Sequence, residues 1–151
     1  MNETMPTSSP SEGYEQHLLQ ALPKLTPEEV AKVSPRLKRQ RFGSGAVVIS
    51  QGDDPDRFYI VIDGEAEVVH EGLSGRTATV DVCRPGDYFG EAGLLQNRPR
   101  NSTVRVPEGG FLEVLAMERD DFLAMLRESK ATEMHVAQEM LQRLIELASA
   151  Q

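Results

Sequence analysis

The sequence predicts a mainly β domain, an antiparallel jelly-roll β-barrel with short helices before it and longer helices after it. Two observations indicate this fold class. Seven short runs of β-branched or alternating apolar residues fill the middle of the chain, and Gly, Pro, Asp and Ser separate them. Apolar residues at helical spacing precede the first of these runs and follow the last. With 151 residues, the chain has the size of one domain with a single core.

The N-terminal part predicts a tail and then a pair of short helices. Residues 1–12 are polar and rich in Ser, Thr and Pro, so we expect a disordered tail there and a folded domain over 13–151. Helical patterns cover residues 14–21 and 26–33. The second begins with Thr-Pro-Glu-Glu, which is typical of a capped helix N-terminus.

The middle of the chain predicts strands, and the last part predicts amphipathic helices. The strands are expected at residues 37–42, 46–50, 58–63, 66–70, 77–83, 102–106 and 111–117. Many short strands with turn residues between them indicate a small antiparallel sandwich or jelly-roll barrel. Helices are expected over residues 120–127 and 134–148. The apolar stripe of the last helix, Val136, Met140, Leu144 and Leu147, fits either a lid over a ligand or a seam between two copies in a homodimer.

Composition excludes several classes of function. The formal net charge of −8 argues against a chain that by itself binds nucleic acid or a membrane surface, because phosphate groups would be repelled. Cys83 is the only cysteine, so an intramolecular disulfide cannot form and a reducing, cytoplasmic setting is expected. No apolar run is long enough to span a membrane.

Residues 86–104, with the sequence GDYFGEAGLLQNRPRNSTV, carry the chemistry. Gly90 allows the backbone to approach a ligand closely, and the short helical turn that begins at Glu91 offers amide groups to an anion. Arg100, next to Pro99, can hold two phosphate oxygens at once. A carboxylate beside a phosphate makes sense if it accepts a hydrogen bond from a sugar hydroxyl. This set of groups fits a compact nucleotide monophosphate.

Two segments resemble a known family. The segment FGEAGLLQNRPRNSTV, residues 89–104, is similar to the phosphate-binding cassette of the cyclic nucleotide-binding domain family, and GDDPDRFYIVIDGEAEV, residues 52–68, is similar to that family's barrel hairpin. The family includes the cAMP-binding domains of protein kinase A regulatory subunits and of catabolite activator-type proteins. The resemblance extends from about residue 14 to 147. It implies a jelly-roll regulatory domain for signal transduction, with a cyclic nucleotide as ligand and no further cofactor.

The resemblance also implies roles for particular residues. Glu91 would hold the ribose 2′-hydroxyl, Arg100 would hold the cyclic phosphate, and Leu94 and Leu95 would link the cassette to the C-terminal helices. The implied ligand-binding residues are Phe89, Gly90, Glu91, Ala92, Arg100, Asn101 and Ser102. Asn101 departs from the family, in which a small residue or Thr usually follows the arginine. The preferred ligand is expected to be cAMP, with cGMP as the alternative.

Catalytic alternatives have less support. A metal-dependent barrel enzyme needs clustered imidazoles, whereas His17, His70 and His135 are far apart in the sequence. No Gly-x-Ser-x-Gly motif occurs, and Cys83 lies in a predicted strand as a core residue, so we expect no enzyme activity and no metal. The leading hypothesis is a sensor in which ligand binding repositions the C-terminal helices and signals to an effector domain or protein. The alternative is a ligand-free scaffold of the same fold for protein interaction or dimerisation.

Overall fold

The computed structural model describes residues 13–149, so the tail predicted for residues 1–12 lies outside the described part of the chain. The first elements are α1 (Tyr14–Ala21), α2 (Pro27–Val33) and the 3-10 turn η1 (Ser34–Arg36). Thr26 starts α2 as the sequence predicts: its Oγ1 accepts a hydrogen bond from the Glu29 backbone N–H at 3.2 Å, and Glu29 Oε1 accepts one from the Thr26 N–H at 2.9 Å.

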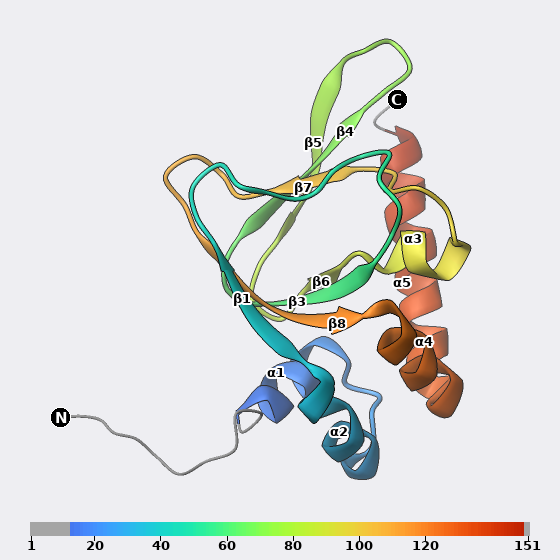
Figure 1. Ribbon diagram of the computed structural model, residues 1–151. Helices are drawn as coiled ribbons and strands as arrows, with labels where there is room; N and C mark the ends of the chain where they lie inside the picture. Colours follow the sequence, from blue (N-terminus) through green and yellow to red (C-terminus); the bar gives the residue numbers. More distant parts are fainter. Residues whose placement is uncertain (1–12, 150–151) are drawn as a thin grey trace, which may run out of the picture.

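The strands form two antiparallel sheets, as predicted for a mainly β fold with flanking helices (Figure 1). The strands are β1 (Lys38–Phe42), β2 (Val47–Ile49), β3 (Arg57–Gly64), β4 (Ala66–Glu71), β5 (Thr77–Cys83), β6 (Tyr88–Phe89), β7 (Thr103–Arg105) and β8 (Leu112–Glu118). One sheet has the order β1-β8-β3-β6 and the other β2-β7-β4-β5. Within residues 13–149 no strand ladder joins the two sheets, so the jelly roll is not closed into a hydrogen-bonded barrel.

Strand β3 separates the two parts of the core. Its residues Phe58, Tyr59, Ile60 and Val61 are all buried, because both faces of the strand are covered. Phe58 and Ile60 pack among the helices, where Phe58 stacks on Phe122 of α4 with ring centroids 4.5 Å apart. Tyr59 and Val61 point between the two sheets. A single strand thus supplies alternate residues to a helix-covered layer and to a sheet-on-sheet layer.

The C-terminal helices follow β8. They are α4 (Arg119–Glu128) and α5 (Lys130–Ser149), and α5 begins four residues earlier than the apolar pattern predicts. Ser129 accounts for the early start, because its Oγ accepts a hydrogen bond from the Thr132 backbone N–H at 3.4 Å and donates one to Thr132 Oγ1 at 2.7 Å. In Figure 1, α5 rises along one side of the sheets beside α3 (Glu91–Gln96).

The two-residue strand β6 positions the cassette residues that follow it, and the sequence pattern did not predict this strand. Its pairs with β3 are Tyr59↔Phe89 and Ile60↔Tyr88. A run of this length shows no recognisable period, so only the tertiary structure reveals it. The pairing fixes the backbone that leads directly into Gly90 and α3.

Candidate functional site

Gly90 and Gly93 allow the segment after β6 to pack tightly. Gly90 has φ of 94°, a left-handed conformation that favours glycine. A Cβ at Gly90 would lie 3.0 Å from the Arg57 carbonyl oxygen and 3.4 Å from Arg100 Nη1. A Cβ at Gly93 would lie 3.0 Å from the Pro55 Cβ. The glycines of the motif are therefore needed for the close approach of α3 to the arginine that follows it.

Arg100 is buried and is held by backbone carbonyl groups. Its Nη1 donates to the Gly90 carbonyl oxygen at 2.7 Å, and its Nη2 donates to the Arg57 carbonyl oxygen at 2.8 Å. Asp56 Oδ1 lies 3.5 Å from Nη2, at the long end of an ion pair. Burial lowers the pKa of Arg100, and Asp56 only partly offsets this. An arginine has more N–H donors than these contacts use, so an oriented guanidinium remains available to an anion.

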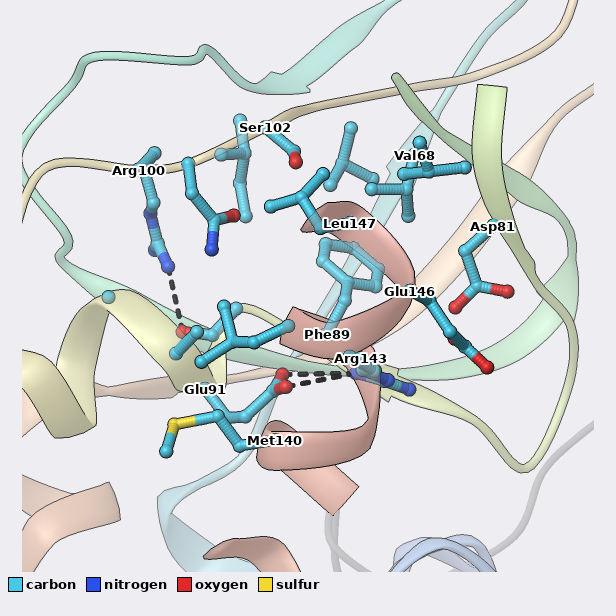
Figure 2. Close-up of a pocket in the computed structure, with 18 residues that line it drawn as sticks. Val68, Asp81, Phe89, Glu91, Arg100, Ser102, Met140, Arg143, Glu146 and Leu147 are labelled. Atoms are coloured by element: carbon cyan, nitrogen blue, oxygen red, sulfur yellow. Dashed lines mark hydrogen bonds and ion pairs between the residues drawn. The ribbon is translucent and has the colours of Figure 1, made fainter. Parts of the chain in front are cut away.

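Glu91 is buried as well, and its partner comes from α5. Its exposed fraction is 3%, and Arg143 Nη1 lies 3.1 Å from Oε1 and 3.2 Å from Oε2. The guanidinium carbon of Arg143 also lies 4.9 Å from the centroid of the Tyr88 ring. Burial lowers the pKa of Arg143, but the Glu91 carboxylate and other acidic groups nearby outweigh this, so the pKa is raised overall. Figure 2 shows this carboxylate and guanidinium pointing toward one another.

Sequence reasoning missed Arg143. No motif links it to Glu91, which lies 52 residues earlier in the chain. The available signal is its place in the last helix, between the apolar residues Met140 and Leu144. A charged residue within a stripe that faces inward needs a partner of opposite charge there. This requirement could have identified Arg143 from the sequence.

All the predicted ligand-binding residues line one pocket. They are Phe89, Gly90, Glu91, Ala92, Arg100, Asn101 and Ser102. The pocket encloses about 680 Å³ of empty space, a volume that includes space open to solvent. The opposite walls come from β4 and β5, through Val68, Val80 and Asp81, and from α5 (Figure 2). The predicted site residues are therefore brought together around a common cavity.

The apolar stripe of α5 faces inward. Val136 is fully buried in the core, and Met140, Leu144 and Leu147 line the pocket. This stripe lies where a lid over a ligand would lie. A seam between two copies would need other apolar side chains, because different ones are exposed on this helix. Those are Met134, Leu141 and Ile145.

The structure also shows the surroundings of the two leucines of the cassette, of Asn101 and of Cys83. Leu94 is buried among the helices, with Leu95 packed against the same cluster, so both link the cassette to the helical layer. The Asn101 backbone oxygen lies 2.8 Å from His70 Nδ1, which anchors the loop after Arg100. Cys83 is buried in the core as predicted, and burial raises its pKa to about 12.

Among residues 13–149, no group of three or more His, Cys, Asp or Glu side chains is arranged to hold a metal ion. In the same part of the chain, no helix has both the length and the apolar character needed to cross a bilayer.

Several curated relatives are regulatory subunits of the cAMP-dependent protein kinase. The chain is 37% identical over 105 residues to a cAMP-dependent protein kinase regulatory subunit of Emericella nidulans, an alignment that covers 70% of this chain and 24% of the relative. It is 36% identical over 97 residues to the corresponding subunit of Dictyostelium discoideum, covering 62% of this chain and 29% of the relative. The chain thus spans only about a quarter of the length of these proteins.

Solved structures share the fold. The regulatory domain of Toxoplasma gondii protein kinase A, determined with cAMP, has a TM-score of 0.76 and 28% identity and covers 85% of this chain and 50% of its own. The Thermus thermophilus catabolite activator protein has a TM-score of 0.71 and 30% identity, covering 87% and 61%. The family model described as the cyclic nucleotide-binding domain matches residues 39–129. Through this match, and with Arg100 and Glu91 lining one pocket, the chain belongs to the cyclic nucleotide-binding domain family.

Proposed function

We propose that this regulatory domain binds cAMP in the pocket between the sheets and α5, with cGMP as a weaker ligand, and that binding changes how α5 packs. One observation carries the proposal. Arg100 and Glu91, both buried, line the same cavity, and each is fixed by contacts with the protein. A buried guanidinium with spare donors in a chain of net charge −8 provides a local site for one anionic group.

Each part of a cyclic nucleotide has a counterpart in the pocket. Arg100 would bind the phosphate through the donors that its carbonyl contacts leave free. Glu91 would accept the hydrogen bond of the ribose 2′-hydroxyl. The base would lie against apolar side chains, namely Val68 of β4 together with Met140 and Leu147 of α5. Helix α5 contains no Phe, Tyr or Trp, so this aliphatic wall would take the place of a stacking ring.

The choice of cAMP over cGMP follows two considerations. The Toxoplasma gondii relative, whose structure was determined with cAMP, supports an adenine ligand by similarity. In the family, a Thr or Ser after the phosphate-binding arginine goes with cGMP, and Asn101 stands at that position here. The Asn101 amide can both donate and accept, so some binding of cGMP is expected as well.

The proposed response of the helices rests on the walls of the pocket. The cassette and α5 both line the pocket, and Leu94 packs in the same core cluster as Phe122 of α4. A ligand that contacts both walls changes their relative positions if it binds one arrangement more tightly, by a differential affinity of typically ~1–3 kcal/mol. The movement would be passed to an effector domain or protein.

Isothermal titration calorimetry tests the proposal. The purified chain should bind cAMP more tightly than cGMP, and it should bind 5′-AMP weakly because the phosphate of 5′-AMP is not held in a ring. A chain that shows no binding of either cyclic nucleotide at high micromolar concentration would refute the sensor function. Unchanged cAMP after prolonged incubation, measured by chromatography, would support a domain that binds its ligand without hydrolysing it.

The scaffold alternative has one observation in its favour. Arg143 already occupies the carboxylate of Glu91, so the chain can satisfy its own sugar-binding group without a ligand. If calorimetry shows no cyclic nucleotide binding while the protein is folded and self-associates in sedimentation velocity, the scaffold explanation replaces the sensor.

A further inference from the structure

The segment between β2 and β3 holds Arg100 by its main chain as well as by its side chain. The Gly52 N–H donates to the Arg100 carbonyl oxygen at 2.8 Å, and the Arg100 N–H donates to the Asp53 carbonyl oxygen at 2.7 Å. The Arg57 carbonyl oxygen, at the start of β3, accepts from the guanidinium. A shift of residues 51–57 would therefore move both the backbone and the guanidinium of Arg100.

Gln51, at the beginning of this segment, is tied to the end of β4 by its side-chain amide. Its Nε2 donates to the Glu71 carbonyl oxygen at 3.0 Å, and its Oε1 accepts from the Glu71 N–H at 2.9 Å. The ladder between β7 and β4 ends at the pair Thr103↔Val69, so Glu71 lies beyond it. The amide of Gln51 therefore supplies the two partners that a further strand residue would give to the Glu71 backbone.

The backbone of Gln51 is held by the neighbouring strand. Its N–H donates to Thr103 Oγ1 at 3.0 Å. Gln51 is half-buried and Glu71 is exposed, and neutral hydrogen bonds at such places add little to the stability of a whole fold. These contacts therefore bear mainly on where the segment lies.

The position of the segment matters because the pocket has walls from separate parts of the chain. Val68 lies in β4, the strand that ends at Glu71, and it lines the pocket with Arg100 (Figure 2). The covalent structure of a nucleotide fixes the separation of its phosphate from its base. A pocket that holds its two contacts at a matching separation before binding loses less free energy to ordering. Gln51 joins the strand that carries one contact to the segment that holds the other.

We propose that Gln51 is a positioning residue that ties residues 51–57 to the end of β4 and thereby holds Arg100 where the cyclic phosphate binds. The tie concerns the chain alone. The part on the phosphate rests on the proposed function, in which Arg100 binds that group. Gln51 does not line the pocket, so it acts through the segment and not by touching the ligand.

The first experiment measures amide exchange by NMR, residue by residue, in the full chain without ligand. Gln51→Met removes both polar groups and keeps a side chain of similar length. It should raise the exchange of the Gly52 and Arg100 amides several-fold, because both donate within the contacts that the tie secures. Gln51→Glu keeps the acceptor for the Glu71 N–H and loses the donor, so its effect should be intermediate. The matched control is Gln142→Met, the same substitution at an exposed position of α5. Equal exchange of the two amides in wild type and Gln51→Met would refute the tie.

The second experiment asks whether Gln51 acts through Arg100, by a double-mutant cycle on the affinity for cAMP measured by calorimetry. In the wild-type background, Gln51→Met should weaken binding about three- to tenfold, because apparent affinity falls with the fraction of chains whose arginine is in place. In the Arg100→Lys background the planar fork is already lost, so Gln51→Met should change the affinity by less than about twofold. Gln142→Met should bind as wild type does.

A side chain that served only the stability of the fold would weaken binding by the same factor in both backgrounds. Equal factors would therefore overturn the positioning role, and so would a Gln51→Met chain that binds cAMP as tightly as wild type.

The two experiments separate this proposal from the proposed function. If wild type binds no cyclic nucleotide, the sensor function fails and the phosphate-positioning role fails with it, while amide exchange still decides whether Gln51 ties the segment. If wild type binds cAMP but the exchange and the affinity are both insensitive to Gln51→Met, the sensor function stands and the role of Gln51 is refuted.

Discussion

Replacement of Arg100 gives the sharpest prediction for ligand affinity. The carbonyl oxygens of Gly90 and Arg57 hold the guanidinium at 2.7 and 2.8 Å, and the side chain is 5% exposed. Its position is therefore set before a ligand arrives, and little conformational entropy remains to be lost on binding. Removing one member of a desolvated pair of opposite charges costs ~2–5 kcal/mol, so Arg100→Ala should weaken cAMP binding about 30-fold to several thousand-fold.

A conservative variant separates charge from geometry. Arg100→Lys keeps the positive charge but loses the planar fork, so it cannot satisfy both carbonyl groups and hold two phosphate oxygens at once. We expect its affinity to lie between those of wild type and Arg100→Ala. Arg98→Ala, at an exposed neighbouring position, is the matched control and should bind as wild type does.

Calorimetry with cAMP provides the affinities, and thermal unfolding of each variant shows how much of a loss comes from the fold. Arg100→Ala leaves buried carbonyl groups without their donor, so its stability should also fall, by ~1–3 kcal/mol. Titration well below each melting temperature keeps the two effects apart. An Arg100→Ala protein that is folded and binds cAMP within threefold of wild type would refute the assignment of Arg100 to the phosphate.

The remaining predictions concern the backbone, the base, the core and the thiol. Gly90→Ala should abolish tight cAMP binding and lower thermal stability, because a Cβ there would lie 3.0 Å from a carbonyl oxygen. The control is Gly52→Ala, at a similar φ of 95° but with open space around it, which should cost only the ~1–2 kcal/mol of left-handed strain. Equal effects of the two substitutions would contradict the packing argument. Asn101→Thr should shift the ratio of cGMP to cAMP affinity toward cGMP in competition titrations, and a ratio that stays the same would remove this residue from base selection. Leu94→Ala should lower the free energy of unfolding in urea by ~2–5 kcal/mol, since the side chain is 2% exposed in the core; a loss under about 1 kcal/mol would mean that the link to the helices is weak. Burial raises the pKa of the Cys83 thiol to about 12, so the thiol should react slowly with iodoacetamide at pH 8 until the protein is unfolded. The unfolded chain loses the thiol proton first as the pH rises from about 9 to 12. The free energy of unfolding should therefore fall over that window in wild type through this thiol, and Cys83→Ala should lack this contribution. Fast alkylation of the native protein would contradict its burial.

Local chemistry explains why so much of the cassette could be predicted. Gly90, Glu91 and Arg100 stand within eleven residues, so the chemistry of their side chains and the family resemblance together predicted one common site, and all three line one pocket. Their roles toward a ligand stay a prediction. The apolar content of β3 was equally clear, because burial on both faces gives an uninterrupted run of large side chains. These features depend on neighbours in the chain, so a pattern can reveal them.

Features that depend on distant contacts were not predictable in the same way. The strand β6 is defined by its pairing with β3, and a run of two residues has no period. Arg143 reaches Glu91 only because α5 folds back across the pocket. The order of strands in the two sheets, and the lack of a ladder between them within residues 13–149, likewise come from tertiary packing. Long-range contacts of this kind assemble the site, and the sequence shows only their separate parts.

A crystal structure of the chain with cAMP tests the central claim most directly. The account predicts a cyclic phosphate within hydrogen-bonding distance of Arg100 and a ribose 2′-hydroxyl within hydrogen-bonding distance of Glu91, with α5 over the base. A nucleotide bound elsewhere, or bound in this pocket with its phosphate away from Arg100, would contradict it.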